Sequence, residues 1–285
     1  MTFSSVHTRR QFIYGTAALA ATPLFAAKSK LKLGVTDWNL NLSGKPEAVA
    51  LAASLGFAGV EISLGRKPGA DKLPLADEAL QQKYLDELKK HKVVAAGTCL
   101  DILHTNYLKS DKLGQKWVAD AIPITKKLDA KVILLPFFGR GAMKTNEELD
   151  YVGDFLHEIG PEAAKSKIIL GLENTNSAEE NVRILERAKC DHVKVYYDVG
   201  NSTGGGYDVV KEIGWLGAKR ICQFHLKDNP HYLGEGKIDF PAVMRTIAAL
   251  GFTGFANLET DSPSKSVPDD MKRNLAFVRD LIAKA

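Results

Sequence analysis

Lys167-Ile-Ile-Leu-Gly-Leu-Glu173 and Val193-Lys-Val-Tyr-Tyr-Asp198 are two short apolar runs, and each ends in an acidic residue. Two later runs have the same form, and they end at His225 and Glu259. The four polar ends are separated by 25, 27 and 34 residues, each about the length of one strand and one helix. In a closed barrel of parallel strands, residues at the carboxyl ends of the strands meet at one rim. We therefore expect these four side chains to converge.

Strand-like runs recur along the whole chain at similar intervals. Helical patterns with start or stop signals lie between them, for instance at 46–55, 77–91, 145–165 and 239–250, and an amphipathic helix is expected at 269–284. This alternation over roughly 255 residues predicts the α/β class and a single (β/α)8 TIM barrel. An open doubly wound sheet is the alternative, but the glycines at 204–206 lack the spacing of a dinucleotide fingerprint. The strand-like runs end near Thr36, Ser63, Thr98, Pro136, Glu173, Asp198, His225 and Glu259.

The amino terminus has the pattern of a targeting segment rather than of a folded element. Residues 8–13, Thr-Arg-Arg-Gln-Phe-Ile, form a twin-arginine pattern, and a modest apolar stretch from Gly15 to Ala27 follows. This stretch is too short to span a bilayer as a stable helix, so no stable membrane insertion is expected. We interpret residues 1–27 as the twin-arginine signal peptide of an exported, periplasmic protein and residues 28–285 as the barrel domain; an uncleaved leader is the alternative.

Charge and cysteine usage argue against several classes of protein. Loss of Arg9 and Arg10 with the leader would lower the formal net charge from +4 to +2, which gives little support for nucleic-acid binding. Cys99, Cys190 and Cys222 are far apart and form no CxxC motif, so neither a zinc ribbon nor a disulfide framework is expected. Cys99 and Cys222 lie in apolar runs and are expected to be buried thiols.

The four strand-end residues combine two Glu, one Asp and one His. One such acid alone is more often a helix N-cap or a solvated loop residue than a ligand. Four of these residues in consecutive strand-helix units favour a site for a divalent metal ion, with carboxylates left for proton transfer.

The segments around these residues resemble the successive motifs of the xylose-isomerase-like barrel superfamily, and most closely its sugar phosphate isomerase/epimerase branch. The resemblance covers nearly all of 28–285. It implies one divalent cation, commonly Mn, Mg, Co or Zn, held by Glu173, Asp198, His225 and Glu259. It also implies a small carbohydrate substrate and, because barrels of this group often pair, a homodimer. The motifs are Leu172-Glu173-Asn174, Tyr197-Asp198-Val199-Gly200, Phe224-His225-Leu226-Lys227-Asp228, Leu233-Gly-Glu-Gly-Lys-Ile-Asp-Phe240 and Leu258-Glu259-Thr260.

The resemblance implies a sugar isomerase or epimerase that acts on a keto sugar or a related polyol-derived ketone. A metal bound to two neighbouring oxygens of such a substrate polarises the carbonyl and acidifies the adjacent C–H, which stabilises an enediolate. Glu173 and Glu259, on opposite faces of the substrate, would remove a proton and return one. Return from the other side gives an epimer, and return to the neighbouring carbon gives an aldose-ketose isomer.

Further residues are candidates for substrate binding. Glu179 lies six residues beyond Glu173, where related ketose epimerases carry a substrate-contacting Glu, although a first-turn helix acid is the alternative. Asn201 and His231 stand where those epimerases carry His and Arg, so the ketose substrate is not fixed by the pattern. The other candidates are Glu61 and His104 as pocket residues, and Trp38 and Phe137 as an apolar wall that ordinary packing would explain equally well.

Three other functions share parts of this pattern. A dehydratase or a β-eliminating lyase acting on a keto sugar or 3-keto-glycoside would use the same enediolate. A non-catalytic carbohydrate-binding protein would have the sugar-binding pocket but would catalyse no reaction. An apurinic endonuclease relative would need more His ligands and a basic surface, and Asn201 stands where that pattern has His.

Overall fold

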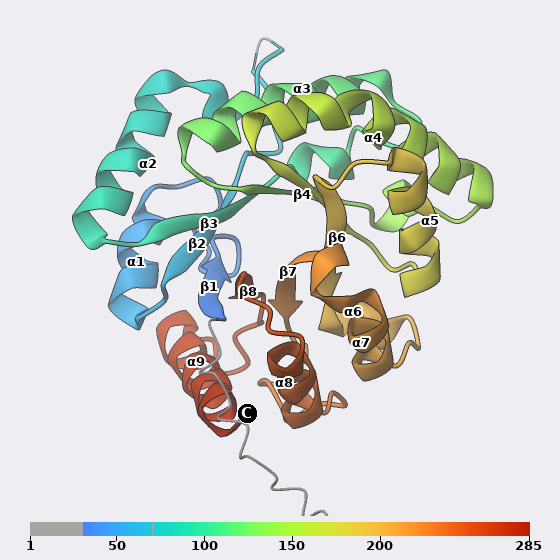
Figure 1. The fold of residues 1–285 in the computed structure, drawn as a ribbon. Coiled ribbons are helices and arrows are strands. Elements are labelled where there is room, and N and C mark those ends of the chain that lie inside the picture. Colours follow the sequence, from blue (N-terminus) through green and yellow to red (C-terminus); the bar gives the residue numbers. More distant parts are fainter. Residues whose placement is uncertain (1–30, 70) are drawn as a thin grey trace, which may run out of the picture.

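Eight parallel strands form a closed barrel in the computed structural model, which describes residues 31–69 and 71–285. Each strand pairs with the next along the chain, and the last pairs with the first, in the order β1-β2-β3-β4-β5-β6-β7-β8 (Figure 1). The predicted (β/α)8 TIM barrel is therefore confirmed. The strands are β1 (Lys32–Thr36), β2 (Gly59–Ser63), β3 (Val94–Cys99), β4 (Val132–Pro136), β5 (Ile169–Glu173), β6 (Val193–Asp198), β7 (Ile221–Leu226) and β8 (Phe255–Leu258).

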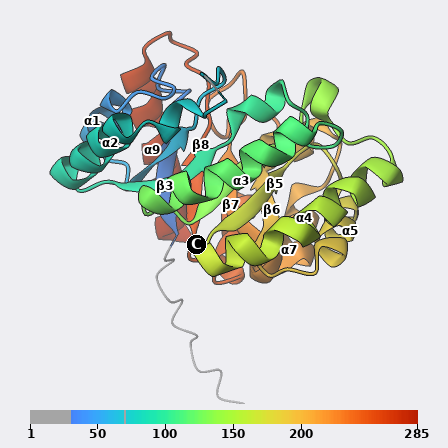
Figure 2. The ribbon, with the colours of Figure 1, turned by 90° about the horizontal axis from the view of Figure 1, so that it is seen from above.

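The helices form a layer outside the barrel (Figure 2). Short 3-10 helices follow β2, β3 and β4 and are labelled η1 (Pro74–Ala76), η2 (Asp101–His104) and η3 (Gly139–Gly141). The α-helices are α1 (Glu47–Leu55), α2 (Glu78–His91), α3 (Lys112–Lys127), α4 (Asn146–Ser166), α5 (Ala178–Ala188), α6 (Val199–Gly204), α7 (Val209–Arg220), α8 (Phe240–Ala249) and α9 (Val267–Lys284).

The predicted elements agree closely with the observed ones because the local signals are strong. Each predicted strand end lies within one residue of an observed end. α1 is capped by Gly56, which adopts a left-handed φ of 93° that a residue without Cβ accepts at no steric cost. α5 begins with a capping box between Ser177 and Glu180. The helix expected at 269–284 begins slightly earlier, at Val267.

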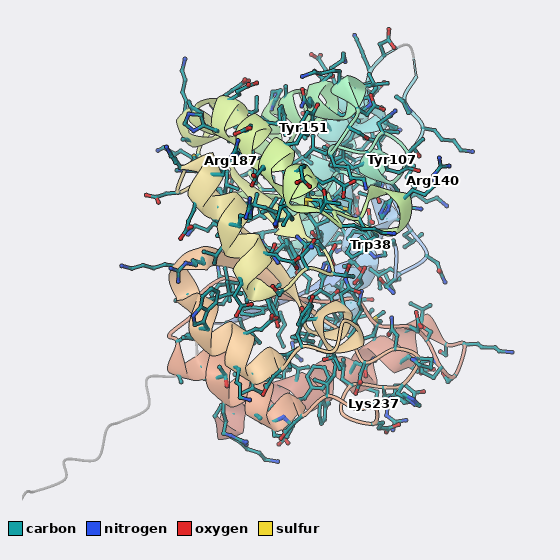
Figure 3. All side chains as sticks on the ribbon, turned by 90° about the vertical axis from the view of Figure 1, so that its right-hand side faces the viewer. Trp38, Tyr107, Arg140, Tyr151, Arg187 and Lys237 are labelled. Atoms are coloured by element: carbon teal, nitrogen blue, oxygen red, sulfur yellow. The ribbon has the colours of Figure 1, made fainter. Side chains whose placement is uncertain are left out.

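The carboxyl ends of the strands and the loops after them form one face of the barrel. Trp38, Tyr107 and Arg140 follow β1, β3 and β4 and lie toward this end, whereas Arg187 in α5 lies toward the other end (Figure 3). The expected leader, residues 1–27, lies outside the described residues. Within the ranges 31–69 and 71–285, none of the helices combines the length and hydrophobicity that a membrane crossing requires.

Candidate metal centre

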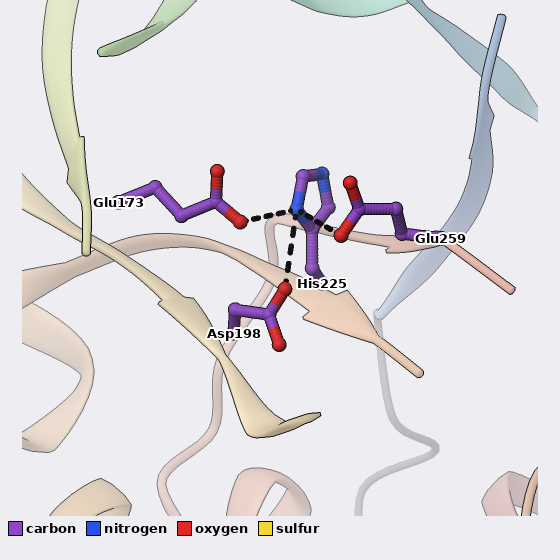
Figure 4. Close-up of side chains that lie close together, drawn as sticks. All are labelled: Glu173, Asp198, His225 and Glu259. Atoms are coloured by element: carbon purple, nitrogen blue, oxygen red, sulfur yellow. Dashed lines mark hydrogen bonds and ion pairs between the residues drawn. The ribbon is translucent and has the colours of Figure 1, made fainter. Parts of the chain in front are cut away.

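Four side chains from consecutive strands meet at the carboxyl end of the barrel. Glu173 ends β5, Asp198 ends β6, His225 lies in β7 and Glu259 directly follows β8. His225 Nδ1 lies 2.9 Å from a Glu173 oxygen, 3.3 Å from a Glu259 oxygen and 3.7 Å from an Asp198 oxygen (Figure 4). One donor atom from each residue lies within 4.8 Å of the other three. We call these four residues the ligand cluster.

Glu61 fixes the orientation of the His225 ring from below. Its Oε2 lies 2.8 Å from His225 Nε2, and both side chains are completely buried. The same oxygen accepts hydrogen bonds from Tyr196 and Asn257. A carboxylate on the far nitrogen of a ligating histidine is the usual arrangement at metal sites, because it sets the ring direction and raises the basicity of the ligating nitrogen.

Asp198 has two functions because of its place at a strand-helix junction. One oxygen accepts a hydrogen bond from the backbone N–H of Asn201 at 2.8 Å and so caps α6. The other lies 2.7 Å from Nζ of Lys227, an ion pair on the cavity side of the cluster. Burial alone would raise the pKa of Asp198, but the charge of Lys227 holds that pKa well below its ordinary range.

The two glutamates of the cluster have different neighbours. Both oxygens of Glu259 are held, one by Trp38 Nε1 at 3.0 Å and the other by Lys227 Nζ at 2.6 Å. Only one oxygen of Glu173 has partners, which are His225 and Asn201. Glu173 therefore keeps one oxygen without a hydrogen bond to any described residue.

Crowding of acidic groups in a dry site perturbs the titration of the cluster. Burial raises the pKa of Glu173 to about 8, and burial also raises the pKa of Glu259. Burial opposes the charge on His225, but Glu259 and the other carboxylates around the ring raise its pKa well above the ordinary value. Such a concentration of buried acidic groups is costly unless a cation is close by.

The donor set fits one divalent ion. Three carboxylate oxygens and one imidazole nitrogen suit Mn, Mg, Co or Zn, and the set does not by itself select one of these metals. Donors about 2.1 Å from an ion lie at most about 4.2 Å from one another, so the observed 4.8 Å limit needs only small adjustments. The four residues of the ligand cluster would hold the ion, and Glu61 would support it through His225.

A cavity of about 230 Å³ opens above the ligand cluster. This small volume suits a monosaccharide-sized ligand better than a drug-sized ligand, for which pockets are typically about 300–1,000 Å³. The ligand-cluster side contributes Glu173, Glu259, Lys227 and Asn201, and the other walls are formed by Trp38, Arg66, Cys99, Asp101, His104, Pro136 and Phe138.

Comparison with known proteins places the chain in a family. The sequence model described as "Xylose isomerase-like TIM barrel" matches residues 49–281. The chain belongs to this family. The resemblance seen in the motifs is thereby confirmed.

Individual relatives within this fold family include several epimerases. The putative L-ribulose-5-phosphate 3-epimerase SgbU of Escherichia coli K12 is 32% identical over 111 residues, which cover 33% of this chain and only 38% of that protein. The D-allulose 3-epimerase structure from Methylomonas has a TM-score of 0.72 at 17% identity and covers 88% of this chain and 98% of its own. The 3-keto-D-glucoside 4-epimerase YcjR from E. coli has a TM-score of 0.73 at 16% identity, with 88% and 99% covered. At these identities the structural likeness concerns the fold.

The other residues expected at the site fall into two groups. Trp38, His104 and Asn201 line the cavity. Glu61 lies beneath His225 and outside the cavity lining, so its place is that of a support for the imidazole.

Three expected positions lie away from the cavity lining. Phe137 is buried in the core, and its neighbour Phe138 takes the place on the wall, because alternate residues at the end of a strand point to opposite sides. Glu179 is exposed in the first turn of α5. His231 is exposed in the loop after β7, where its backbone pairs with Asp228. Neither contributes to the cavity lining.

Sequence reasoning missed Arg66, Asp101, Lys227 and Phe138 as cavity residues. For Asp101 a signal was present, since it follows β3 closely, much as Glu259 follows β8. Lys227 follows His225 by two residues and so returns to the same side of the chain. No pattern in the sequence indicated the direction of Arg66, because it lies in a loop. Cys99 and Cys222 are free, buried thiols, as expected.

Proposed function

We propose that the protein is a metal-dependent isomerase or epimerase of a keto sugar. The observation that carries this proposal is the convergence of Glu173, Asp198, His225 and Glu259 on one point beneath a polar cavity of about 230 Å³. A divalent ion bound there would polarise a substrate carbonyl and stabilise the enediolate formed by loss of the neighbouring proton.

Glu173 is suited to accept that proton. Its carboxyl lines the cavity, and one of its oxygens has no hydrogen bond to a described residue. Burial raises its pKa to about 8, so its basicity approaches that of a general base matched to neutral pH.

Glu259 is suited to act from the other side. The two glutamates lie on either side of the His225 ring (Figure 4). Lys227 and Trp38 hold both oxygens of Glu259, which fixes the direction of its carboxylate. Proton return from this side to the same carbon would invert its configuration, and return to the adjacent carbon would move the carbonyl.

The relatives support the same class of reaction. The names of SgbU, YcjR and the Methylomonas enzyme all describe epimerases of sugars or sugar derivatives. A further structure of the same fold is that of the IolI protein with a bound zinc atom. It has a TM-score of 0.70 at 16% identity and covers 89% of this chain and 99% of its own.

Proton NMR of keto sugars in D2O with the Mn2+-loaded protein tests the proposal. Exchange of the C–H next to the carbonyl, together with formation of an epimer or an aldose, is the expected result. Glu173→Gln should abolish the exchange. An enone or a released aglycone would identify a β-eliminating lyase and contradict the proposal. Sugar binding without any C–H exchange would indicate a carbohydrate-binding protein.

Export by the twin-arginine route is proposed from residues 8–13 alone. Replacing Arg9 and Arg10 with Lys should keep the protein in the cytoplasm, while the matched replacement of Lys28 and Lys30 with Arg should leave export unchanged. Cell fractionation measures the outcome. Equal export of both variants would contradict this route.

A further inference from the structure

The wall of the cavity away from the ligand cluster carries its own polar group. Ser63 ends β2, and Arg66 and Asp101 follow β2 and β3. In the closed order of eight strands, β2 lies across the barrel from β6 and β3 lies across from β7. A sugar held by the ligand cluster at its carbonyl end would therefore direct its other end toward this wall. We name Arg66, Asp101 and His104 the distal subsite.

Asp101 is the buried anchor of the distal subsite. Ser63 Oγ donates a hydrogen bond of 2.5 Å to Asp101 Oδ2, and Arg66 Nε lies 3.7 Å from Oδ1. The Asp101 carboxylate is almost completely buried, yet it lines the cavity, and its Oδ1 accepts no hydrogen bond from the side chain of any described residue. A lining oxygen of this kind is suited to accept a hydrogen bond from a hydroxyl group of a ligand.

His104 completes the distal subsite with a ring and a polar edge. The imidazole stacks on Phe138, with ring centroids 6.2 Å apart and an interplanar angle of 22°. Burial and the nearby charge of Arg66 lower the pKa of His104, so the ring is neutral at pH 7 and has one donor and one acceptor nitrogen. A neutral imidazole beside an aromatic surface suits the mixed polar and apolar faces of a sugar.

Charge in the cavity disfavours an anionic ligand at this end. Only Arg66 and Lys227 are permanently cationic among the described lining residues. Arg66 is paired with Asp101, and Lys227 is paired with Asp198 and Glu259. A phosphate ester entering here would find no uncompensated cation and would lie near carboxylates instead.

We infer that the distal subsite binds the hydroxyl-bearing end of an uncharged keto sugar and discriminates against its terminal phosphate ester. This inference rests on the proposed function for the orientation of the sugar. It assigns substrate selection to the first half of the barrel, through Asp101 and His104 as hydrogen-bonding partners and Arg66 as the partner of Asp101.

Calorimetric binding to the Mn2+-loaded protein tests the inference with three matched pairs. The probes are D-fructose, D-tagatose and L-ribulose, each compared with its 6-phosphate or, for ribulose, its 5-phosphate. At least one free sugar should bind about tenfold or more tightly than its phosphate ester, because the ester faces an unfavourable charge. A phosphate ester that binds more tightly than its free sugar, or failure of all six probes to bind, would overturn the inference.

Two variants show whether the distal subsite causes the selection. Asp101→Asn should weaken binding of the free sugar about tenfold, because the amide replaces one acceptor oxygen of the carboxylate with a donor. It should also reduce the preference for the free sugar over its phosphate ester, because the negative charge that repels the phosphate is lost. Arg66→Gln, at a side chain that is 63% exposed, should also weaken binding of the free sugar without unfolding the protein. Asp191→Asn, an exposed control before β6, should change neither affinity. Unchanged affinities in both distal variants would overturn the inference.

The same samples separate this inference from the proposed function. Selective binding of a free sugar without C–H exchange in D2O would leave the distal subsite supported and contradict the isomerase proposal. Exchange that prefers the phosphate ester would support the isomerase proposal and contradict the distal subsite.

Discussion

The two halves of the barrel contribute different chemistry to one cavity. Strands β5 to β8 direct three carboxylates and one imidazole to a single point, where acidic groups are buried without enough positive charge from the protein. The segments after β2 and β3 instead present a paired Arg and Asp, and the loop after β4 presents Phe138. One side thus has the donor atoms for a cation, and the other has the paired charges from which we inferred binding of an uncharged ligand.

Under the proposed function, this symmetric scaffold would place the reacting groups in one half and the groups that recognise the substrate in the other. All eight strands end at the same rim, so position alone would allow ligands anywhere around it. Glu61 of β2 is an acid from the first half that reaches the centre, and it contacts His225 from beneath. Its place under the imidazole makes it a link between the halves.

Removing a metal-ligating side chain should have the largest effect among the changes that compare the two halves. His225→Ala takes away the only nitrogen donor of the ligand cluster and leaves Glu61 buried without its partner. We expect loss of stoichiometric metal and a fall in turnover of about a thousandfold or more. Metal analysis and D2O exchange measure the two effects.

Asp101→Asn is the matched control from the other half of the barrel. It should retain the full metal content, because Asp101 is not part of the ligand cluster. If both variants lost metal equally, the division between the two halves would be wrong.

Glu61→Gln should have an intermediate effect. The amide keeps the size of the side chain but removes the charge that orients His225 and raises its basicity. Metal affinity should fall about 10- to 100-fold, as for other partners of ligating histidines. Competition with a fluorescent chelator measures the affinity, and Glu179→Gln, at an exposed acid in α5, serves as the control. An unchanged affinity would mean that Glu61 is only a packing residue.

Much of this division follows from the sequence, but not all of it. The strand ends and the ligand cluster were predictable because a buried apolar run fixes where a parallel strand ends. Whether a side chain near that end points into the cavity depends on a single residue of register, which is why Phe137 was named in place of Phe138. Loop residues such as Arg66 have no periodicity, and their direction depends on tertiary contacts, here with Asp101. Glu61 was recognised as an inward residue, yet only the three-dimensional structure places it beneath His225.

The affinity of the ligand cluster for Mn2+ should change gradually with pH, and this effect should be smaller than those of the variants. It should involve only groups from the second half of the barrel. Burial raises the pKa of Glu173 to about 8, and the surrounding carboxylates raise the pKa of His225. Both groups therefore hold protons in the ion-free protein near pH 7, and these protons must leave when the ion binds. Mn2+ affinity should rise by about tenfold per pH unit for each proton released, and the contribution of Glu173 should level off above about pH 8.

The stability of the ion-free protein should also depend on pH. A group whose pKa is raised in the folded state contributes its full stabilisation when the pH is below its pKa in the unfolded chain. This contribution is lost as the pH rises through its pKa in the folded state. The ion-free protein should therefore become less stable toward pH 8 on account of Glu173, while the increase in Tm on adding Mn2+ becomes larger. The lowered pKa of Asp198 has the opposite effect on stability, but only at acidic pH below the range tested.

Calorimetry in buffers of different ionisation enthalpy counts the protons released when Mn2+ binds. Asp101→Asn should leave that count unchanged, and binding that releases no proton would show that Glu173 and His225 are already deprotonated in the ion-free protein.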